Sequence, residues 1–520
     1  MKHVCRKALS VILVIAVLFS FAALTVSAEN FTAVPTVYLY GYGSVLYEDK
    51  TDSSSKVIFP AAVPDNFASE VVDKVKGPIS KGVLLNDWDE FHQVVVDTVC
   101  DIYSGFALDE NGEVTDQSGN IYANYSYPLD DRKNASGYEL NTYNYSYDWR
   151  IDPFEVADGL HEYIEEVCKA TGYDKVNLIG RCLGGNIILA YLKVYGYSQV
   201  DQICFYAPGF QGFECIGALF SGDIVFDVDA LPDYFDQAGR AQLSSGDNPT
   251  YDLLVTALEF LNAAKTLNVA KPVFNHYLIP EFRQYILPEI MRRTFGTLPS
   301  FWSFIGDEYY DQAMQVIFGG YEETYAGIIE KANRYHHEVM AHTGDLINDS
   351  VDNGVETYIV AKYGSRMVPI VKNADVQSDS TVTTANSSHG AATAPLYGSF
   401  SDDFVKGIQT ANGGKYLSAD HQIDASSCLL PDHTWLIKNL FHHENPDQVE
   451  KMIAAFFDYD GYMSVFDQEV YPQYLNYDRD TDSISPLSSD ASASKAPKYS
   501  FFKSLIALIK LIITVLKNSR

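Results

Sequence analysis

The sequence predicts an α/β protein in which a mostly parallel sheet is covered by helices on both faces. Short apolar stretches rich in β-forming residues recur along the chain and lead into glycine or proline turns, at 34–40, 175–179, 202–206 and 355–361. Amphipathic helical patterns separate several of them, the clearest over 153–171. Strands that alternate with helices are typical of parallel sheets, which are buried on both faces.

The elements follow in order along the chain. The first strand ends at Gly41-Tyr42-Gly43-Ser44, which indicates a tight loop. Asp152 and Pro153 provide an N-cap and a first-turn proline for a helix that closes at Thr171-Gly172. Between about 210 and 350, aromatic and apolar helical patterning is too long for a simple crossover and predicts a helical cap inserted over the sheet edge.

The chain is strongly acidic. Its 68 aspartates and glutamates against 37 lysines and arginines give a formal charge of −31. A phosphate backbone needs a basic surface, so this balance argues against nucleic acid as a partner. Seven cysteines in 520 residues are too few for a disulfide scaffold.

The N-terminus is typical of a secretory signal peptide over residues 1–28. Basic residues precede an apolar stretch at 10–26, and Val26-Ser27-Ala28 has the small-residue pattern of a cleavage site. An uncleaved membrane anchor is the alternative, although the apolar core is short for a span. Cleavage before Glu29 would place the folded protein outside the cytoplasm.

The C-terminal segments differ in composition from the predicted α/β domain at 29–477. Residues 478–498 are rich in serine and aspartate and predict a linker. Residues 499–520 predict a basic amphipathic helix, whose lysines fall near one face. A basic helix on an acidic protein favours an anionic membrane or envelope surface. A short transmembrane span and a helix packed back on the domain are the alternatives.

The strongest functional signal is a strand–turn–helix pattern around Cys182. Gly180-Arg181-Cys182-Leu183-Gly184 has the G-x-nucleophile-x-G layout of an α/β-hydrolase elbow, with cysteine in the place of serine. Glycines fit there because side chains two residues from the nucleophile would collide in so sharp a turn. The turn would lift the Cys182 thiol above the sheet and present the Leu183 N–H to an oxyanion. The alternative is a glycine-rich turn with a buried structural cysteine.

Further motifs resemble the lecithin:cholesterol acyltransferase-like branch of α/β-hydrolases. Tyr147-Asp148-Trp149-Arg150 precedes the elbow, and LYGYGSVLY at 39–47 looks like that family's oxyanion loop. Later segments look like its strand ends and acid loop: YAPGFQG at 206–212, VETYIVAKYG at 355–364 and QSDSTVTTANSS at 377–388. The resemblance implies an α/β-hydrolase fold and an esterase, lipase or acyltransferase activity on an ester or lipid-like substrate.

The elbow departs from that family, whose nucleophile is serine. VNLIGRCLGG at 176–185 instead resembles the cysteine box of polyhydroxyalkanoate synthases, which also transfer acyl groups on an α/β-hydrolase fold. Those enzymes act on intracellular thioesters, and a signal peptide does not fit that substrate.

The acid and the base are expected after the nucleophile, in that order. Asp379 is the first choice for the acid because it follows the strand at 355–361 and resembles the family's acid loop, although Ser378 and Ser380 replace the glycines usual there. The alternatives are Asp420 and Asp424.

The histidine is expected in LLPDHTWLIKNLFHHE at 429–444, because the base lies in a loop after the last strand. His442 is the first choice, and His443 and His433 are the alternatives. His389 and the pair His336 and His337 are assigned to the surface or the cap. No carboxylate and histidine spacing around that pair suits a metal, so neither a metal nor a cofactor is expected.

Together these residues predict nucleophilic acyl transfer. His442, oriented by Asp379, would take the proton of Cys182, and the thiolate would attack an ester or thioester carbonyl. The N–H groups of Leu183 and Tyr42 would hold the oxyanion. Two further residues are expected either to brace the loop beside the pocket or to form a structural cation–aromatic anchor, namely Trp149 and Arg150.

The sequence therefore predicts a secreted or surface-associated acyl hydrolase or acyltransferase. The alternative is a non-catalytic protein of the same fold that binds lipid or a partner at the cell envelope. A cysteine-dependent peptidase is a weaker alternative, since no peptidase signature accompanies the elbow.

Overall fold

The computed structural model describes residues 34–61, 67–121, 142–225, 227, 229–239, 271–272 and 274–493. The predicted signal peptide and the predicted C-terminal helix lie outside these residues. Within the described ranges, no helix has both the length and the hydropathy that a membrane span needs.

An eight-stranded sheet forms the centre of the protein, in the order β12-β11-β10-β7-β6-β5-β1-β4. Every neighbouring pair is parallel except β11 and β12. This sheet confirms the predicted fold class. The strands are β1 (Thr36–Leu39), β4 (Thr142–Tyr145), β5 (Val176–Arg181), β6 (Val200–Tyr206), β7 (Glu356–Tyr363), β10 (Thr434–Lys438), β11 (Tyr474–Asp478) and β12 (Ser483–Pro486).

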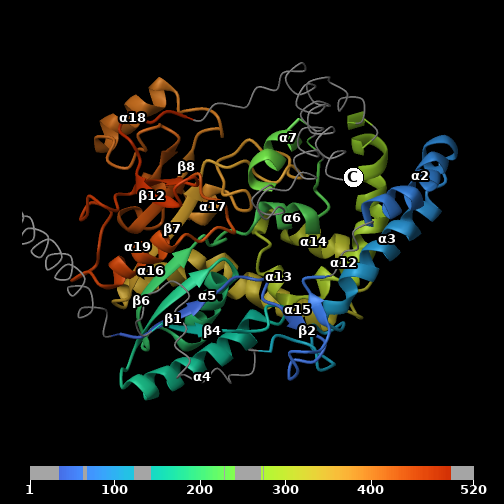
Figure 1. Ribbon diagram of the computed structural model, residues 1–520, viewed down its shortest axis with the longest axis horizontal. Helices are drawn as coiled ribbons and strands as arrows, with labels where there is room; N and C mark the ends of the chain where they lie inside the picture. The colour runs from blue at the N-terminus through green and yellow to red at the C-terminus, as the bar shows by residue number, and fades with distance from the viewer. Residues whose placement is uncertain are drawn as a thin grey trace, which may run out of the picture.

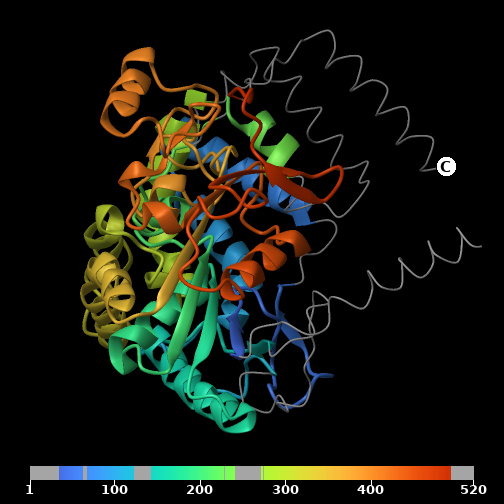
Figure 2. The same ribbon diagram turned by 90° about the vertical axis from the view of Figure 1, so that its left-hand side faces the viewer.

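Helices cover both faces of the sheet (Figure 1), because successive side chains of a buried strand point to opposite sides. Leu178 of β5 packs with Leu160 and Ile187 on one face, whereas its neighbour Ile179 packs with Ile453 on the other. Figure 2 shows the strands between helices drawn in yellow and the orange-red α19. The helices that cover the sheet are α4 (Pro153–Thr171), α5 (Leu183–Tyr195), α16 (Thr343–Asp352) and α19 (Asp447–Phe457).

Helix α4 begins and ends where its sequence signals predict. The Asp152 side chain accepts a hydrogen bond from the Phe154 N–H at 3.0 Å, which satisfies one of the free donors at the helix start. Gly172 ends the helix with φ of 80°, a left-handed conformation that glycine adopts without strain. The chain then enters β5, which leads to the elbow.

The cap consists of two segments that are far apart in the sequence. Between β6 and β7 lie α6 (Glu214–Phe220), α7 (Leu231–Tyr234), α11 (Ile279–Glu281), α12 (Leu287–Arg292), α13 (Pro299–Trp302), α14 (Asp307–Phe318) and α15 (Ala326–Glu338). The second segment contains α2 (Phe67–Leu85) and α3 (Asp89–Tyr103) and lies beside α12 in Figure 1. Its Trp88 and Phe91 pack with Ile286 and Ile290. The last helix before β7, α16, instead contacts α5 and β7 and belongs to the sheet layer.

Shorter elements fill the loops. A two-stranded ribbon pairs β2 (Leu46–Tyr47) with β3 (Val57–Phe59), and another pairs β8 (Ala392–Thr393) with β9 (Ile423–Asp424). Between β7 and β10 the chain also forms α17 (Thr384–Ser387) and α18 (Asp402–Asn412). The acid loop lies at the start of this long connection.

The predicted start of the linker at residue 478 is corrected by the structure. Strand β12 lies within the segment expected to be a linker and pairs antiparallel with β11, with Tyr477 opposite Ile484. An edge strand exposes one side to water, so it tolerates serine and aspartate and needs few apolar residues. Composition alone therefore did not indicate it.

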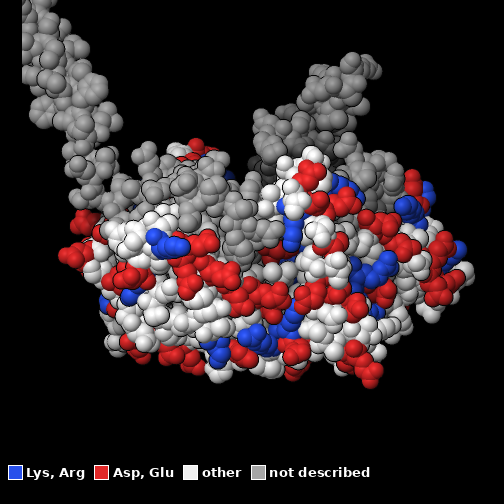
Figure 3. Space-filling model, turned by 90° about the horizontal axis from the view of Figure 1, so that it is seen from below, with Lys and Arg blue, Asp and Glu red and all other residues white. Residues whose placement is uncertain are grey.

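The described surface is rich in carboxylates. In Figure 3, acidic side chains are spread over the visible face and basic side chains are scattered among them. Many lysines and arginines are engaged by carboxylates, for example Lys331 by Glu113 and Glu155.

The packing of α19 on the sheet should depend strongly on the side chain of Phe456, and with it the stability of the protein. This side chain is fully buried, and its ring lies 4.2 Å from that of Trp435, centre to centre. We expect Phe456→Ala to lower the free energy of unfolding by about 3–5 kcal/mol, measured by urea denaturation. Phe404→Ala, on the 37% exposed Phe404 of α18, is the matched control and should cost about 1 kcal/mol or less. Equal losses of unfolding free energy for the two variants would contradict a special contribution of Phe456 to the packing of α19 on the sheet.

Candidate active site

Cys182 occupies a strained turn between β5 and α5. Its φ is 52° and its ψ is −120°, a combination that L-residues avoid and that costs about 1–3 kcal/mol. The Cys182 N–H donates to the Tyr206 carbonyl at 3.1 Å, and the Cys182 carbonyl accepts from the Gly185 N–H at 2.9 Å. The turn therefore has the geometry of a nucleophile elbow, with the thiol at the N-terminus of α5.

The elbow glycines are required by close backbone contacts. A Cβ added at Gly184 would collide with the carbonyl of Leu39, and one added at Gly180 would lie 2.9 Å from the Gly185 Cα. Any larger residue would push α5 away from β1 or from the turn itself. The steric reason given for these glycines from the sequence thus holds in the structure.

Asp379 is fully buried at the start of the connection after β7. Its Oδ1 accepts hydrogen bonds from the backbone N–H groups of Thr381 at 3.0 Å and Val382 at 2.9 Å. Burial opposes the charged carboxyl, but His442, Lys362 and the Val382 N–H hold its pKa below the usual value. Ser380 adopts a φ of 83°, so the backbone keeps a left-handed turn although serine replaces glycine.

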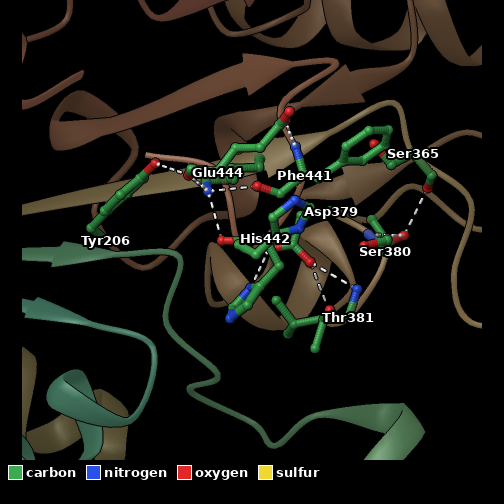
Figure 4. Close-up of polar contacts among 12 residues, drawn as sticks. Tyr206, Ser365, Asp379, Ser380, Thr381, Phe441, His442 and Glu444 are labelled. Carbon is green, nitrogen blue, oxygen red and sulfur yellow. Dashed lines mark hydrogen bonds and ion pairs between the residues drawn. The ribbon is translucent and has the colours of Figure 1, made fainter. Parts of the chain in front are cut away.

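His442 lies in the loop after β10 and contacts Asp379 twice. Its Nδ1 lies 2.7 Å from Asp379 Oδ2, and its backbone N–H donates to the Asp379 carbonyl at 2.8 Å. Figure 4 shows the ring held against the carboxylate, with Thr381 on the other side. Burial opposes the imidazolium, yet Asp379 and Cys182 raise the pKa of His442 to about 9.

The orientation of the His442 ring leaves its second nitrogen for the thiol. Nε2 is buried and has no nitrogen or oxygen partner among the described residues. Cys182 and His442 line the same cavity, and Cys182 contributes to the raised pKa of the imidazole. Asp379, His442 and Cys182 are thus brought together in the order that a base-activated nucleophile requires.

The alternative residues lie in other surroundings. Asp420 is buried with Lys438, whose Nζ lies 2.8 Å from its Oδ2. Asp424 accepts a hydrogen bond from the Ser426 hydroxyl. His433 donates from Nδ1 to the Met463 carbonyl at 2.8 Å. The exposed His443 lines the cavity but makes no ion pair with a carboxylate among the described residues.

The loop after β1 lies directly against the nucleophile. A Cβ at Gly41 would lie 2.9 Å from the Cys182 Cβ and 3.4 Å from its Sγ. The residue that follows is Tyr42, whose ring is half exposed and packs edge-on against Trp149 and Phe301. Absence of a side chain at Gly41 therefore brings the backbone of this loop next to the thiol.

The Tyr147–Arg150 motif holds that loop in place. The Tyr147 hydroxyl donates to the Tyr40 carbonyl, and the Trp149 Nε1–H donates to the Ser44 carbonyl at 2.9 Å. Tyr147 also lines the cavity, whereas Trp149 lies behind it.

Arg150 fixes the Tyr147–Arg150 motif to neighbouring segments through its guanidinium group. Its fully buried guanidinium pairs with Asp148, at 2.7 Å between Nη2 and Oδ2, and donates to the carbonyls of Phe106 and Ser118. Its partners are therefore a carboxylate and backbone carbonyls, and they differ from the aromatic partner considered from the sequence. Arg150 does not line the cavity.

The cavity above Cys182 has a volume of about 790 Å³. Aromatic side chains form part of its wall, and polar groups come from Arg181, His443 and several other residues, among them Ser44, Asn120 and Thr381. This size and composition suit an organic ligand rather than a bare ion. The aromatic residues are Tyr40, Tyr42, Phe59, Tyr145 and Tyr147.

Two cations at the site were missed in the sequence. Lys362 of β7 donates to the carbonyls of Phe441, His442 and Glu444, and Arg181 of the elbow donates to those of His442 and His443. A lysine directly after the apolar run YIVA at 358–361 was the available signal. Among the described residues, no group of histidines, cysteines and carboxylates is arranged to hold a metal ion.

The fold and the elbow define an α/β-hydrolase. Residues 108–226 match the sequence model of the lecithin:cholesterol acyltransferase family. This stretch contains the Tyr147–Arg150 motif and the elbow, so the resemblance predicted from the sequence is confirmed over it. The match supports an acyl hydrolase or acyltransferase as the general class of the protein.

Other comparisons add little. No curated protein matches the chain. A solved structure described as "The crystal structure of Tle4-Tli4 complex" has 14% sequence identity and a TM-score of 0.23, and the match covers 63% of this chain and 75% of that chain. So distant a likeness does not bear on function.

The His442–Asp379 pair should make stability depend on pH. The pKa of His442 is about 9 in the folded protein against about 6.5 for a free histidine, so its contribution is complete below about pH 6.5 and is lost as the pH rises through 9. We expect the difference in free energy of unfolding between wild type and His442→Gln to shrink over this window by up to about 3 kcal/mol. Using this difference cancels the contribution of other titrating groups.

His443→Gln serves as the matched control in urea unfolding at several pH values. Partial burial and the nearby cations lower the pKa of His443, so the stability difference for this variant should be flat above about pH 6.5. A His442→Gln difference that is equally flat would mean that the imidazole carries no extra charge in the folded protein.

Proposed function

We propose that the protein is an acyl hydrolase or acyltransferase of the esterase or lipase type, which works through a Cys182–His442–Asp379 triad and an acyl-enzyme. The observation that carries the proposal is the 2.7 Å contact between His442 Nδ1 and Asp379 Oδ2, made beside a cysteine in a strained elbow. A structural ion pair would not need a strained thiol beside its free ring nitrogen. The family match over residues 108–226 supports the same class of reaction.

The proposed reaction begins with proton transfer. His442 Nε2 takes the proton from the Cys182 thiol, and Asp379 stabilises the imidazolium that forms. The thiolate sulfur then bonds to the carbonyl carbon of the substrate, and the carbonyl electron pair moves onto oxygen. The backbone N–H groups of Leu183 and Tyr42 stabilise this oxyanion, by about 3–4 kcal/mol for each donor.

The second half of the reaction releases the products. The oxyanion collapses, the bond to the leaving alcohol breaks, and the imidazolium returns its proton to the alcohol oxygen. A thioester with Cys182 remains. Water or a second alcohol attacks it with His442 as base, which gives the acid or a new ester and regenerates the thiol.

The cavity supports an ester with an apolar portion. Its five aromatic side chains offer apolar surface in the cavity that also contains the thiol, and polar side chains such as Ser44, Asn120 and Ser146 could orient a ligand there. We propose an ester or lipid-like small molecule as the substrate class. We also propose that the signal peptide at 1–28 directs export of the protein. The basic segment at 499–520 would then attach it to an anionic envelope surface.

Hydrolysis of chromogenic acyl esters of graded chain length tests the activity. Wild type should release the chromophore, and Cys182→Ala should reduce kcat by roughly a thousandfold or more. Cys168→Ala removes another cysteine, in α4 and outside the cavity, and should leave kcat nearly unchanged. If wild type does no better than Cys182→Ala at every chain length, hydrolysis of such esters is not the function, and a non-catalytic binding protein becomes the better interpretation.

Alkylation by iodoacetamide tests the nucleophile independently of the substrate. Burial raises the pKa of the five other described cysteines, Cys100, Cys168, Cys204, Cys215 and Cys428. Cys182 should therefore react first near neutral pH, and His442→Ala should slow it roughly tenfold or more. Peptide mass spectrometry gives the rate for each thiol. Uniform labelling, or no labelling without denaturant, would contradict an activated thiol.

A further inference from the structure

We propose that Lys362 is a positioning residue for the reactive histidine, because its ammonium group holds the loop that carries His442 through three backbone carbonyls. The inference rests on the catalytic role proposed above for His442. Lys362 lies in β7, opposite Ile437 of the neighbouring β10, and only 1% of its surface is exposed. Its side chain therefore acts from inside the sheet on the loop that follows β10.

The contacts of Lys362 are complete and specific. Its Nζ lies 2.9 Å from the Phe441 carbonyl, 3.1 Å from that of His442 and 3.0 Å from that of Glu444. An ammonium group has three N–H donors, so each donor has one carbonyl. The ring of Tyr206 also lies beside the ammonium group, with its centre 4.5 Å from Nζ.

Arg181 and Tyr206 also bind carbonyls of this loop, but Lys362 binds more of them than either. The remaining carbonyl of the loop, that of His443, accepts from Arg181, which also contacts the His442 carbonyl at 3.3 Å. The Tyr206 hydroxyl donates to the Glu444 carbonyl at 3.0 Å. Four successive carbonyls thus point at two cations, and the imidazole on the other side of the backbone is turned toward Asp379. Figure 4 shows His442 and Glu444 around this point.

Protonation of Lys362 decides whether all three carbonyls are bound. A neutral amine has two N–H donors and would leave one buried carbonyl without a partner. Burial and the nearby Arg181 lower the pKa of Lys362 to about 7, while Asp379 and Glu444 act in the opposite direction. The titratable and charged groups that face Lys362 from its neighbours are Arg181, Cys182, Tyr206, Asp379, His443 and Glu444.

The role is tested by the rate at which iodoacetamide alkylates Cys182 in the full-length protein. Lys362→Met keeps the length of the side chain and removes the donors, and we expect the rate constant near neutral pH to fall roughly tenfold to a hundredfold. Lys362→Arg keeps the charge and the donors and should recover most of the rate. Lys438→Met is the matched control: it removes a buried lysine from the adjacent strand, and that lysine binds Asp420 instead of the histidine loop. Its rate should equal that of wild type.

A wild-type measurement tests the inference even if Lys362→Met does not fold. Through about pH 7 and above, the rate constant for Cys182 should decline as the ammonium loses its third donor, although thiols in general become more reactive with rising pH. A rate that only rises and levels off would overturn the inference, as would a folded Lys362→Met variant with the wild-type rate. Failure of wild-type Cys182 to react ahead of the other thiols would instead overturn the proposed function.

Discussion

The hydrogen-bonded ion pair between His442 and Asp379 joins the two loops on which the site depends. One loop follows β7 and the other follows β10, and these two strands are neighbours in the sheet. A second bond, from the His442 N–H to the Asp379 carbonyl, fixes the backbones as well as the side chains. The imidazole therefore has one orientation, and its Nε2 is left for the thiol.

Local constraints explain how much of this site could be predicted from the sequence. Gly180 and Gly184 have no room for a Cβ, so the elbow pattern around Cys182 is imposed by sterics and is visible in the sequence. Asp379 and His442 follow strands whose apolar composition marks them clearly. Their mutual contact, however, arises only when β7 and β10 pair, and no short-range pattern encodes that pairing.

The elements that were missed depend on partners distant in the chain. Helix α3 is recognisable as part of the cap only because Phe91 meets Ile286 and Ile290, nearly two hundred residues later. Strand β12 takes its place from β11, and its own composition is that of a linker. Lys362 looks like an irregularity in an apolar strand until the carbonyls of the histidine loop surround it. Burial of a charge is decided by tertiary contacts, which the local sequence does not contain.

The buried negative charge of Asp379 at this site is compensated by neighbouring cations. Asp379 alone would be a costly buried carboxylate, and the neighbouring Lys362 lowers its pKa together with His442. Two cations, the His442 imidazolium and Lys362, therefore favour the charged carboxyl, and the N–H groups of Thr381 and Val382 bind one of its oxygens. In the proposed reaction this carboxylate stabilises the imidazolium that forms when His442 takes the proton of Cys182. A lysine whose hydrogen bonds all go to backbone carbonyls thus also favours the charge on the carboxylate beside the proposed base, and this gives a physical role to a charged residue buried in a parallel sheet.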